Sequence, residues 1–420
     1  MTPQRPAAKS VCVIGLGYIG LPTATVLAQS GATVTGVDVN AVTVDAVNRG
    51  TVPFVEEGLE TAVAGVVAQG RLKAQVEVSP AEAYVVAVPT PFTDEHRADL
   101  TYIESAARSI APHLTGGELV ILESTSPPGA TERMAEVILA ERGDLTGEDG
   151  HPNSVYFAHC PERVLPGRIM IELVQNDRII GGTTRAAAEM ARDLYSRFCQ
   201  GELLLTEAKT AEMAKLTENA FRDVNIAFAN ELSLISDHLG IDVWELIELA
   251  NHHPRVNILK PGPGVGGHCI AVDPWFIVSA DEQNSRLIST AREVNDSKPR
   301  HVVEQVMGKA ERFRQPVIAA LGIAFKANID DLRESPSRNI VAELAQRLSD
   351  GKLLVVEPNI DELPPDLAVR TNVELSSLSD GLERADIVLL LVDHAPFNHV
   401  DQDLLREKVV LDTRGLWRQA

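Results

Sequence analysis

A glycine- and proline-rich segment at residues 260–276 carries the side chains with the clearest chemical potential. It reads K-P-G-P-G-V-G-G-H-C-I-A-V-D-P-W-F and places a thiol, Cys269, four residues before a carboxylate, Asp273. A backbone so rich in glycine can approach a ligand closely, and its free N–H groups can surround an anion. A thiolate adds readily to an aldehyde, and the thiohemiacetal that forms can be oxidised to a thioester. We expect Asp273 to orient the water that hydrolyses the thioester.

A second motif, Gly15-Leu16-Gly17-Tyr18-Ile19-Gly20, directly follows a predicted strand and directly precedes a predicted helix. Gly15 allows a tight turn, Gly17 lets a pyrophosphate approach the backbone, and Gly20 allows the helix to pack closely on the strand. The helix N-terminus supplies N–H donors and the positive end of a dipole. The next predicted strand ends in Asp38, which can bind both ribose hydroxyls and repels a 2′-phosphate. The motif therefore predicts NAD as the cofactor, in preference to NADP.

Lys215 and Asn219 lie four residues apart in a segment with a helical pattern, so they share one helix face, which Arg222 continues. An amine beside an amide can bind a substrate hydroxyl, and the amine can stabilise or move its proton. An isolated pair of this kind is more often part of a solvated polar stripe. Its presence beside a dinucleotide motif and a cysteine loop favours a catalytic pair. Whether Lys215 acts as a base or only as a positive charge stays open.

Weaker candidates are clusters that combine polar side chains with glycine or proline, at residues 123–129, 161–167, 251–255 and 325–336. From them we take Thr125 and Glu162 as further catalytic candidates, with Glu162 as an acid or base in a cleft. His252 and His253 suggest a metal site, but no third ligand stands at a matching spacing, so no metal is expected.

The elements that must position these residues follow an α/β pattern. Short apolar runs predict strands at residues 11–14, 33–37, 84–88, 119–122, 155–158, 178–181, 317–321, 353–356, 387–392 and 409–412. Between the two groups of strands, residues 206–249 are predicted to be helical, with Gly240 as the only glycine, and residues 285–312 form a second helical stretch. We expect an α/β fold with two Rossmann-like, doubly wound domains joined by a long central helix. The predicted parts are residues 1–205, 206–312 and 313–420.

Composition limits the class of protein. The 420 residues carry a net charge of −21, which argues against nucleic acid or an anionic membrane as the main partner. The four cysteines include no C-x-x-C pair, as expected for a reducing compartment, and Cys12 and Cys199 fit structural positions whereas Cys160 stays undecided. The N-terminus lacks the apolar segment of a signal peptide, and the longest aliphatic run, at residues 387–392, is too short to span a bilayer. We expect a cytoplasmic protein.

With these motifs in this order, the chain resembles the UDP-glucose/GDP-mannose dehydrogenase family over nearly its whole length. The blocks that carry the resemblance are G-L-G-Y-I-G, V-P-T-P, E-S-T-S-P-P-G, P-E-R-V-L-P-G, K-L-T-E-N-A-F-R-D, G-P-G-V-G-G-H-C-I-A-V-D-P-W-F and D-D-L-R-E-S-P. Two further blocks, T-E-N-A-F-R-D-V-N-I-A-F-A-N-E-L-S-L-I and N-H-H-P-R-V-N-I-L, are similar to bacterial members that oxidise UDP-N-acetyl-D-mannosamine. Those members make the uronic acid that is used in surface polysaccharides such as enterobacterial common antigen.

The resemblance implies a homodimer that oxidises the C6 alcohol of a UDP-sugar to a carboxylate with two NAD+. It implies that Cys269 is the nucleophile and Lys215 the residue that handles the proton. The positions similar to NAD contacts are Tyr18, Ile19, Asp38, Thr90, Thr125 and Arg333. The positions similar to UDP-sugar contacts are Arg163, Val164, Asn219, Arg222, His253, Arg255, Gly266 and Lys326, to which we add Lys215 and Phe325. His253 and Arg255 are expected to reach across the dimer, and the role of Arg414 stays open.

Three alternatives remain. The same chemistry could act on another nucleotide sugar, UDP-glucose or UDP-N-acetylglucosamine. A two-electron β-hydroxyacid dehydrogenase also combines a dinucleotide motif with a Lys/Asn helix, but it needs neither Cys269 nor a second α/β domain. A binding module that uses NAD and a nucleotide sugar only as signals would not need a nucleophile.

Overall fold

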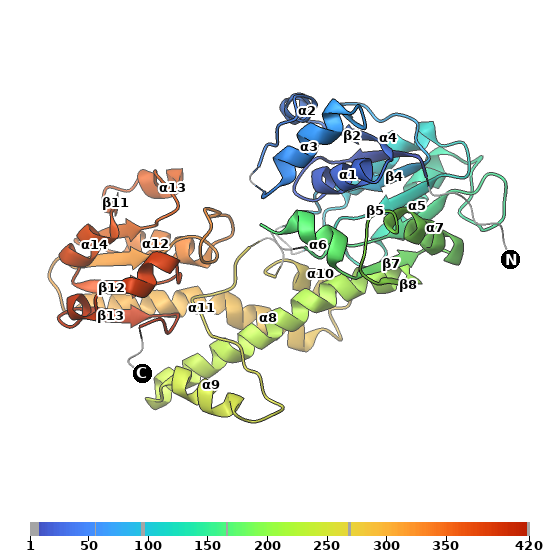
Figure 1. Cartoon of the computed structure of the whole chain (residues 1–420). Helices are drawn as coiled ribbons and strands as arrows, with labels where there is room; N and C mark the ends of the chain where they lie inside the picture. Colours follow the sequence, from blue (N-terminus) through green and yellow to red (C-terminus); the bar gives the residue numbers. More distant parts are fainter. Residues whose placement is uncertain (1–7, 55, 94–96, 165–166, 268–269, 418–420) are drawn as a thin grey trace. The chain divides into compact units, whose positions relative to one another are not determined.

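The structure is a computed structural model, and it describes residues 8–54, 56–93, 97–164, 167–267 and 270–417. The chain divides into two compact units, Met1–Glu218 with Trp275–Asp281, and Asn219–Pro274 with Glu282–Ala420. Figure 1 shows a β-sheet flanked by helices in each unit. The predicted α/β class with two Rossmann-like sheets is confirmed, whereas the division at residues 205 and 312 stays a prediction.

The first sheet has the strand order β3-β2-β1-β4-β5-β6-β7-β8 in the described residues. Its strands are β1 Ser10–Ile14, β2 Thr33–Val37, β3 Leu72–Gln75, β4 Ala83–Val86, β5 Leu119–Leu122, β6 Tyr156–His159, β7 Arg178–Gly182 and β8 Leu203–Glu207. Its helices are α1 Gly20–Gln29, α2 Ala41–Asn48, α3 Leu59–Ala68, α4 Thr101–Ile110, α5 Ala130–Glu141, α6 Ile169–Gln175 and α7 Arg185–Tyr195. Neighbouring strands are parallel, except for the pair β6 and β7. The strand order reverses at β1 and β4, and ligands of doubly wound sheets bind at the carboxyl ends of such strands.

Alternate side chains of each strand enter different cores, because successive residues of a strand point to opposite faces of the sheet. Val11 and Val13 belong to a core that includes residues of α1, α3 and α7. Cys12 and Ile14 belong to a second core, with residues of α4 and α5. Helices therefore cover both faces, which leaves the ends of the strands as the place for a ligand.

The central segment contains α8 Ala208–Leu239, α9 Val243–Asn251, α10 Asp273–Ala280 and α11 Arg286–Ala310. Figure 1 shows α8 as one long continuous helix. The prediction of an unbroken helix over residues 206–249 is wrong at Gly240, which takes a left-handed φ of 69° and so ends α8. Asp242 then starts α9 by accepting hydrogen bonds from the backbone N–H groups of Trp244 and Glu245.

The second sheet is parallel throughout its described strands, in the order β11-β10-β9-β12-β13. Its strands are β9 Val317–Leu321, β10 Lys352–Val356, β11 Val373–Leu375, β12 Ile387–Leu390 and β13 Val409–Asp412, and its helices are α12 Pro336–Arg347, α13 Pro365–Ala368 and α14 Leu378–Arg384. Alternate residues of β9 again divide between two cores: Ile318 and Ala320 lie in the core with α11 and α12, whereas Ala319 and Leu321 lie in the core with α14.

Three strands escaped prediction, β3, β8 and β11, and each forms an edge of its sheet. β3 and β11 read L-K-A-Q and V-E-L, so their apolar patterns are weak, whereas β8 reads L-L-L-T-E and was missed despite its apolar run. No helix in the described parts of the chain is both long enough and apolar enough to cross a membrane.

Candidate functional site

The loop between β1 and α1 has the backbone that a dinucleotide needs. Gly15 takes a φ of 93°, and a Cβ on it would lie 2.4 Å from the Ala87 carbonyl oxygen. A Cβ on Gly20 would lie 1.8 Å from the Gly15 carbonyl oxygen. A Cβ on Gly17, in contrast, would meet nothing within 4 Å. Gly15 and Gly20 are therefore required by close packing within the protein. Gly17 instead leaves open space where a pyrophosphate can approach.

Asp38 lies directly beside this loop. One oxygen of its carboxylate accepts a hydrogen bond from the Leu16 backbone N–H at 2.9 Å, and the other accepts one from the Asn40 N–H at 2.8 Å. These bonds orient the half-buried carboxylate at the end of β2, beside the glycine motif. This position fits the binding of ribose hydroxyls.

The remaining predicted cofactor contacts of the first unit lie on this same loop and on the loops after β4 and β5. Tyr18 is exposed and stacks on Phe54, with ring centroids 4.4 Å apart, and Ile19 precedes α1. Thr90 follows β4 and Thr125 follows β5, so both come after the carboxyl ends of strands parallel to β1. The buried Thr90 hydroxyl has no hydrogen-bond partner within the described part of the chain, so it is available to a ligand.

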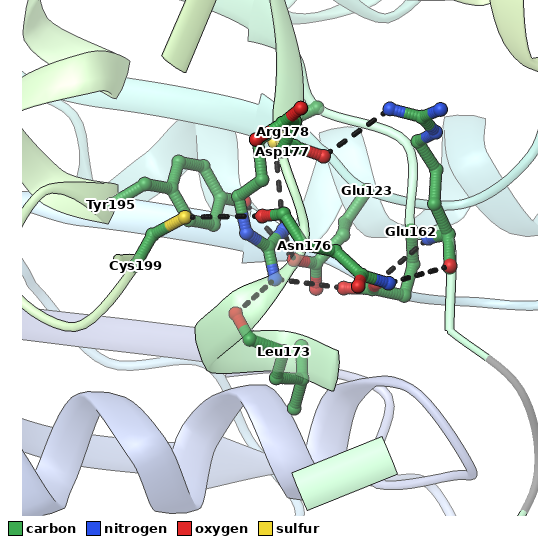
Figure 2. A network of polar contacts seen from close by, with 10 residues as sticks. Glu123, Glu162, Leu173, Asn176, Asp177, Arg178, Tyr195 and Cys199 are labelled. Atoms are coloured by element: carbon green, nitrogen blue, oxygen red, sulfur yellow. Dashed lines mark hydrogen bonds and ion pairs between the residues drawn. The ribbon is translucent and has the colours of Figure 1, made fainter. Parts of the chain in front are cut away.

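Glu162 belongs to a buried group of charges (Figure 2). Arg178 donates from Nη2 to Glu162 Oε2 at 3.0 Å, and its Nη1 lies 3.7 Å from Glu123 Oε1. The Tyr195 hydroxyl donates to the same Glu123 oxygen at 3.1 Å, and the Arg163 backbone N–H donates to Glu162 Oε1 at 2.7 Å. Both carboxylate oxygens of Glu162 therefore bind groups of the protein, and its predicted catalytic role stays a prediction.

One guanidinium faces two carboxylates in this interior. Burial first, and repulsion from Glu162 second, raise the pKa of Glu123 to about 7, although Arg178 lowers it. Burial also raises the pKa of the neighbouring Cys160 thiol to about 12, and none of its surface is exposed, which disfavours Cys160 as a nucleophile. Arg178 and Tyr195 were not among the residues predicted from the sequence. One feature of the sequence could have indicated them: Arg178 stands at the start of an apolar strand. A cation buried in this way requires a carboxylate partner nearby.

Two predicted substrate contacts, Arg163 and Val164, come directly after Glu162 in the chain. The Arg163 guanidinium pairs with Glu218 on α8 at 2.7 Å and donates to the Asp177 carbonyl at 3.2 Å. Val164 packs against a small apolar cluster that includes Ile169. These contacts orient the segment after β6 and neither support nor contradict the predicted substrate contacts.

Asn219 and Asp273 meet directly. Lys215 lies one turn before Asn219 on α8, and both are half-buried. The Asn219 amide donates from Nδ2 to Asp273 Oδ2 at 2.5 Å, and Asp273, at the start of α10, is buried. Cys269 lies outside the described residues, but it precedes Asp273 by only four positions. The bond therefore connects the helix of the predicted Lys/Asn pair to the segment that carries the predicted nucleophile.

The glycine loop before Cys269 packs against the second sheet's domain. A Cβ on Gly266 would lie 2.4 Å from the Glu334 carbonyl oxygen, and one on Gly267 would lie 3.0 Å from the Phe325 ring. The Lys326 ammonium is exposed and lies 5.9 Å from the Phe325 ring centroid. The sequence motifs around residues 266 and 325 thus come together in space.

The other predicted ligand contacts in the second compact unit are either exposed or paired with a carboxylate. Arg222 on α8, and His253 and Arg255 after α9, are exposed. Arg333 forms a bidentate pair with Asp331. Arg414 pairs with Asp393 at 3.0 Å, and its guanidinium lies close to Gly262 of the glycine loop. Within the described residues, no group of three His, Cys, Asp or Glu side chains could bind a metal ion.

Comparison with known proteins gives matches along nearly the whole chain. Three models of the UDP-glucose/GDP-mannose dehydrogenase family match: its NAD binding domain at residues 9–199, its central domain at residues 209–297 and its UDP binding domain at residues 319–419. The chain belongs to this family.

Individual relatives cover nearly the same length. An NDP-N-acetyl-D-galactosaminuronic acid dehydrogenase of Ralstonia nicotianae is 57% identical over 97% of this chain and 96% of the relative. A UDP-N-acetyl-D-mannosamine dehydrogenase of Escherichia coli is 53% identical over 97% of this chain and 99% of the relative. The solved structure of a UDP-D-ManNAc dehydrogenase from Pyrococcus horikoshii has a TM-score of 0.86 and 37% identity, over 98% of this chain and 96% of that one.

As a member of the UDP-glucose/GDP-mannose dehydrogenase family, the chain is an NAD-dependent nucleotide-sugar dehydrogenase, and the predicted use of NAD is confirmed. The match to the NAD binding domain contains the glycine motif and Asp38, and the match to the central domain contains Lys215, Asn219 and Asp273. The alternative of a β-hydroxyacid dehydrogenase is therefore dropped.

Proposed function

We propose that this enzyme oxidises the C6 alcohol of UDP-N-acetyl-D-mannosamine to UDP-N-acetyl-D-mannosaminuronate, with two NAD+ per sugar. The observation that carries the proposal is the 2.5 Å hydrogen bond between Asn219 and Asp273. It joins the turn after Lys215 to Asp273, so an amide and a carboxylate meet one turn from an amine; Cys269, four residues before Asp273 in the sequence, is the nucleophile that we assign to the same site.

The choice of sugar rests on relatives. Relatives named UDP-N-acetyl-D-mannosamine dehydrogenase match over nearly their whole length, as does the P. horikoshii structure. One observation favours a second candidate, a nucleotide-linked N-acetyl-D-galactosamine, because the R. nicotianae relative, an NDP-N-acetyl-D-galactosaminuronic acid dehydrogenase, has the higher identity of 57%. Both candidates are nucleotide-linked N-acetylhexosamines, which differ at C2 and C4 of the sugar and share the same C6 chemistry.

The residues that would bind the cofactor fit it. Gly17 leaves space for the pyrophosphate, and the oriented carboxylate of Asp38 is placed for the ribose hydroxyls. Thr90 and Thr125 follow the neighbouring parallel strands, and we assign Arg333 to the same cofactor. Bound NAD+ would supply a hydride acceptor in each of two oxidations.

The protein's own groups would perform the remaining steps. Lys215 takes the C6 hydroxyl proton, or stabilises the alkoxide, as the alcohol becomes an aldehyde. The Cys269 thiolate then adds to the aldehyde carbon, and the C–S bond persists as that carbon is oxidised to a thioester. Water oriented by Asp273 attacks the thioester carbon. The C–S bond breaks, which releases the carboxylate and restores the thiol.

We also propose that the enzyme is a homodimer that pairs through α8. Phe221, Phe228 and Ile235 are 70%, 51% and 48% exposed, and their seven-residue spacing places them on one face of α8. An exposed apolar stripe on a long helix suits a second copy of the same helix. In that dimer we expect His253 and Arg255 to serve the partner's site. Location in the cytoplasm and a place in surface polysaccharide synthesis remain predictions.

The decisive experiment counts NADH released per sugar, with excess NAD+ and limiting UDP-sugar. UDP-N-acetyl-D-mannosamine should give two NADH per sugar, and UDP-glucose should be turned over far more slowly. Cys269→Ala should abolish formation of the uronate. One NADH per sugar would overturn the covalent route, whereas faster turnover of UDP-N-acetylgalactosamine would move the assignment to the galacto sugar.

A further inference from the structure

Glu212 is a buried carboxylate that the proposed mechanism does not use. It lies on α8, three residues before Lys215, with 0% of its surface exposed. One oxygen accepts from the Gly129 backbone N–H at 2.6 Å. The other accepts from the Thr131 backbone N–H at 2.8 Å and from the Thr131 hydroxyl at 2.6 Å. All three donors belong to one short segment of the chain.

That segment is the N-terminus of α5. The residue before the helix is Gly129, at a φ of 98°, which has no side chain with which to cap the first turn. A helix N-terminus presents free N–H groups and a partial positive charge, which a carboxylate satisfies. Glu212 therefore caps α5 from 83 residues further along the chain, counted from Gly129.

The loop between β5 and α5, at residues 123–129, carries Thr125. We propose that Glu212 is a positioning residue, whose bonds to Gly129 and Thr131 hold this loop in register with the turn of α8 that carries Lys215. The inference rests on the proposed function, which assigns Thr125 to the cofactor and Lys215 to the sugar hydroxyl. Both oxidations need cofactor and hydroxyl in one geometry, so a shift of the loop against α8 slows them.

A second, weaker contact joins the same two helices. Lys209 on α8 and Glu132 on α5 pair at 3.9 Å, and their side chains are 65% and 36% exposed. Exposed pairs at this distance contribute little. Glu132 thus supplies a matched control: a carboxylate of the first turn of α5, facing α8, without the buried hydrogen bonds.

The test compares Glu212→Gln with Glu132→Gln in the full-length enzyme. A glutamine keeps one acceptor but turns its NH2 toward an N–H donor, so the loop must move. With UDP-N-acetyl-D-mannosamine as substrate, E212Q should raise the Kd and KM for NAD+ several-fold and lower kcat roughly tenfold to a hundredfold. The Kd of the UDP-sugar alone should stay unchanged. E132Q should match the wild type in each measurement.

Thr131→Val covers the case in which E212Q does not fold. It removes the hydroxyl bond and keeps both N–H bonds, so it should raise the KM for NAD+ about twofold to fivefold. An unchanged KM and kcat per folded enzyme, with only a lower Tm, would show that Glu212 serves stability alone and would overturn the inference. The Kd of NAD+ needs no sugar, so this result is independent of whether the proposed sugar is right.

Discussion

At the scale of single residues, the chemistry depends on where charge is buried. Asp38 has its carboxylate oriented by two N–H groups at the surface of the cofactor loop. Glu123 and Glu162 instead share one guanidinium, that of Arg178, in the interior. A carboxylate can therefore lie beside the predicted cofactor loop in one place and pair with a buried guanidinium in another, according to its partners.

Glu123 gives a pH prediction. Burial raises its pKa to about 7, above the ordinary value near 4.5 of an unfolded chain, so the native state binds the proton more tightly. The stability from this group is present in full below pH 4.5 and is lost as pH rises through 7. Glu123→Gln cannot titrate. The unfolding free energy of the wild type should therefore fall relative to E123Q by on the order of 3 kcal/mol between pH 4.5 and 8.

Chemical denaturation of both proteins across that range measures the difference. Exposed Glu248→Gln, on α9, is the control and should show no such trend. A constant difference between wild type and E123Q would mean that Glu123 is ionised throughout.

At the scale of elements, the turn from β1 to α1 separates two roles of glycine. Gly20 allows helix and strand to approach, whereas Gly17 faces open space. Gly20→Ala should destabilise the protein by roughly 2–4 kcal/mol, because its methyl group would overlap the Gly15 carbonyl oxygen.

Gly17→Ala should leave the Tm nearly unchanged but raise the KM for NAD+ about tenfold, since its methyl occupies the space that a pyrophosphate needs. Thermal denaturation without cofactor, followed by kinetics, separates the two effects. Equal losses of stability in both variants would contradict this division of roles.

At the scale of the whole molecule, the exposed stripe of α8 predicts assembly. Phe228→Glu introduces charge into the middle of the proposed helix pair, so the dimer should dissociate at least tenfold more readily. Sedimentation over a range of concentrations measures this. Val369→Glu, a charge at an exposed apolar residue away from α8, is the control and should leave the dimer intact. A wild-type protein that is monomeric at every concentration would refute the proposed dimer.

Features that depend on neighbours along the chain could be predicted from the sequence. The glycine motif with Asp38, the Lys215–Asn219 spacing and the central strands of both sheets are local patterns, and they were sufficient to predict the fold class, NAD and the family. The edge strands β3 and β11 escaped because they are short and partly polar, whereas β8 was missed despite its apolar L-L-L run, and the edge strand β13 was predicted.

The partners of the buried charges, in contrast, depend on the tertiary structure. Glu212 caps α5 from a distant helix, and Arg178 joins Glu123 to Glu162 across three segments of the chain. Neither set has a characteristic spacing, because the folded chain, and not sequence proximity, brings its members together. A carboxylate in a sequence shows that a charge is present; its burial and its hydrogen-bond donors determine whether it serves stability, positioning or catalysis.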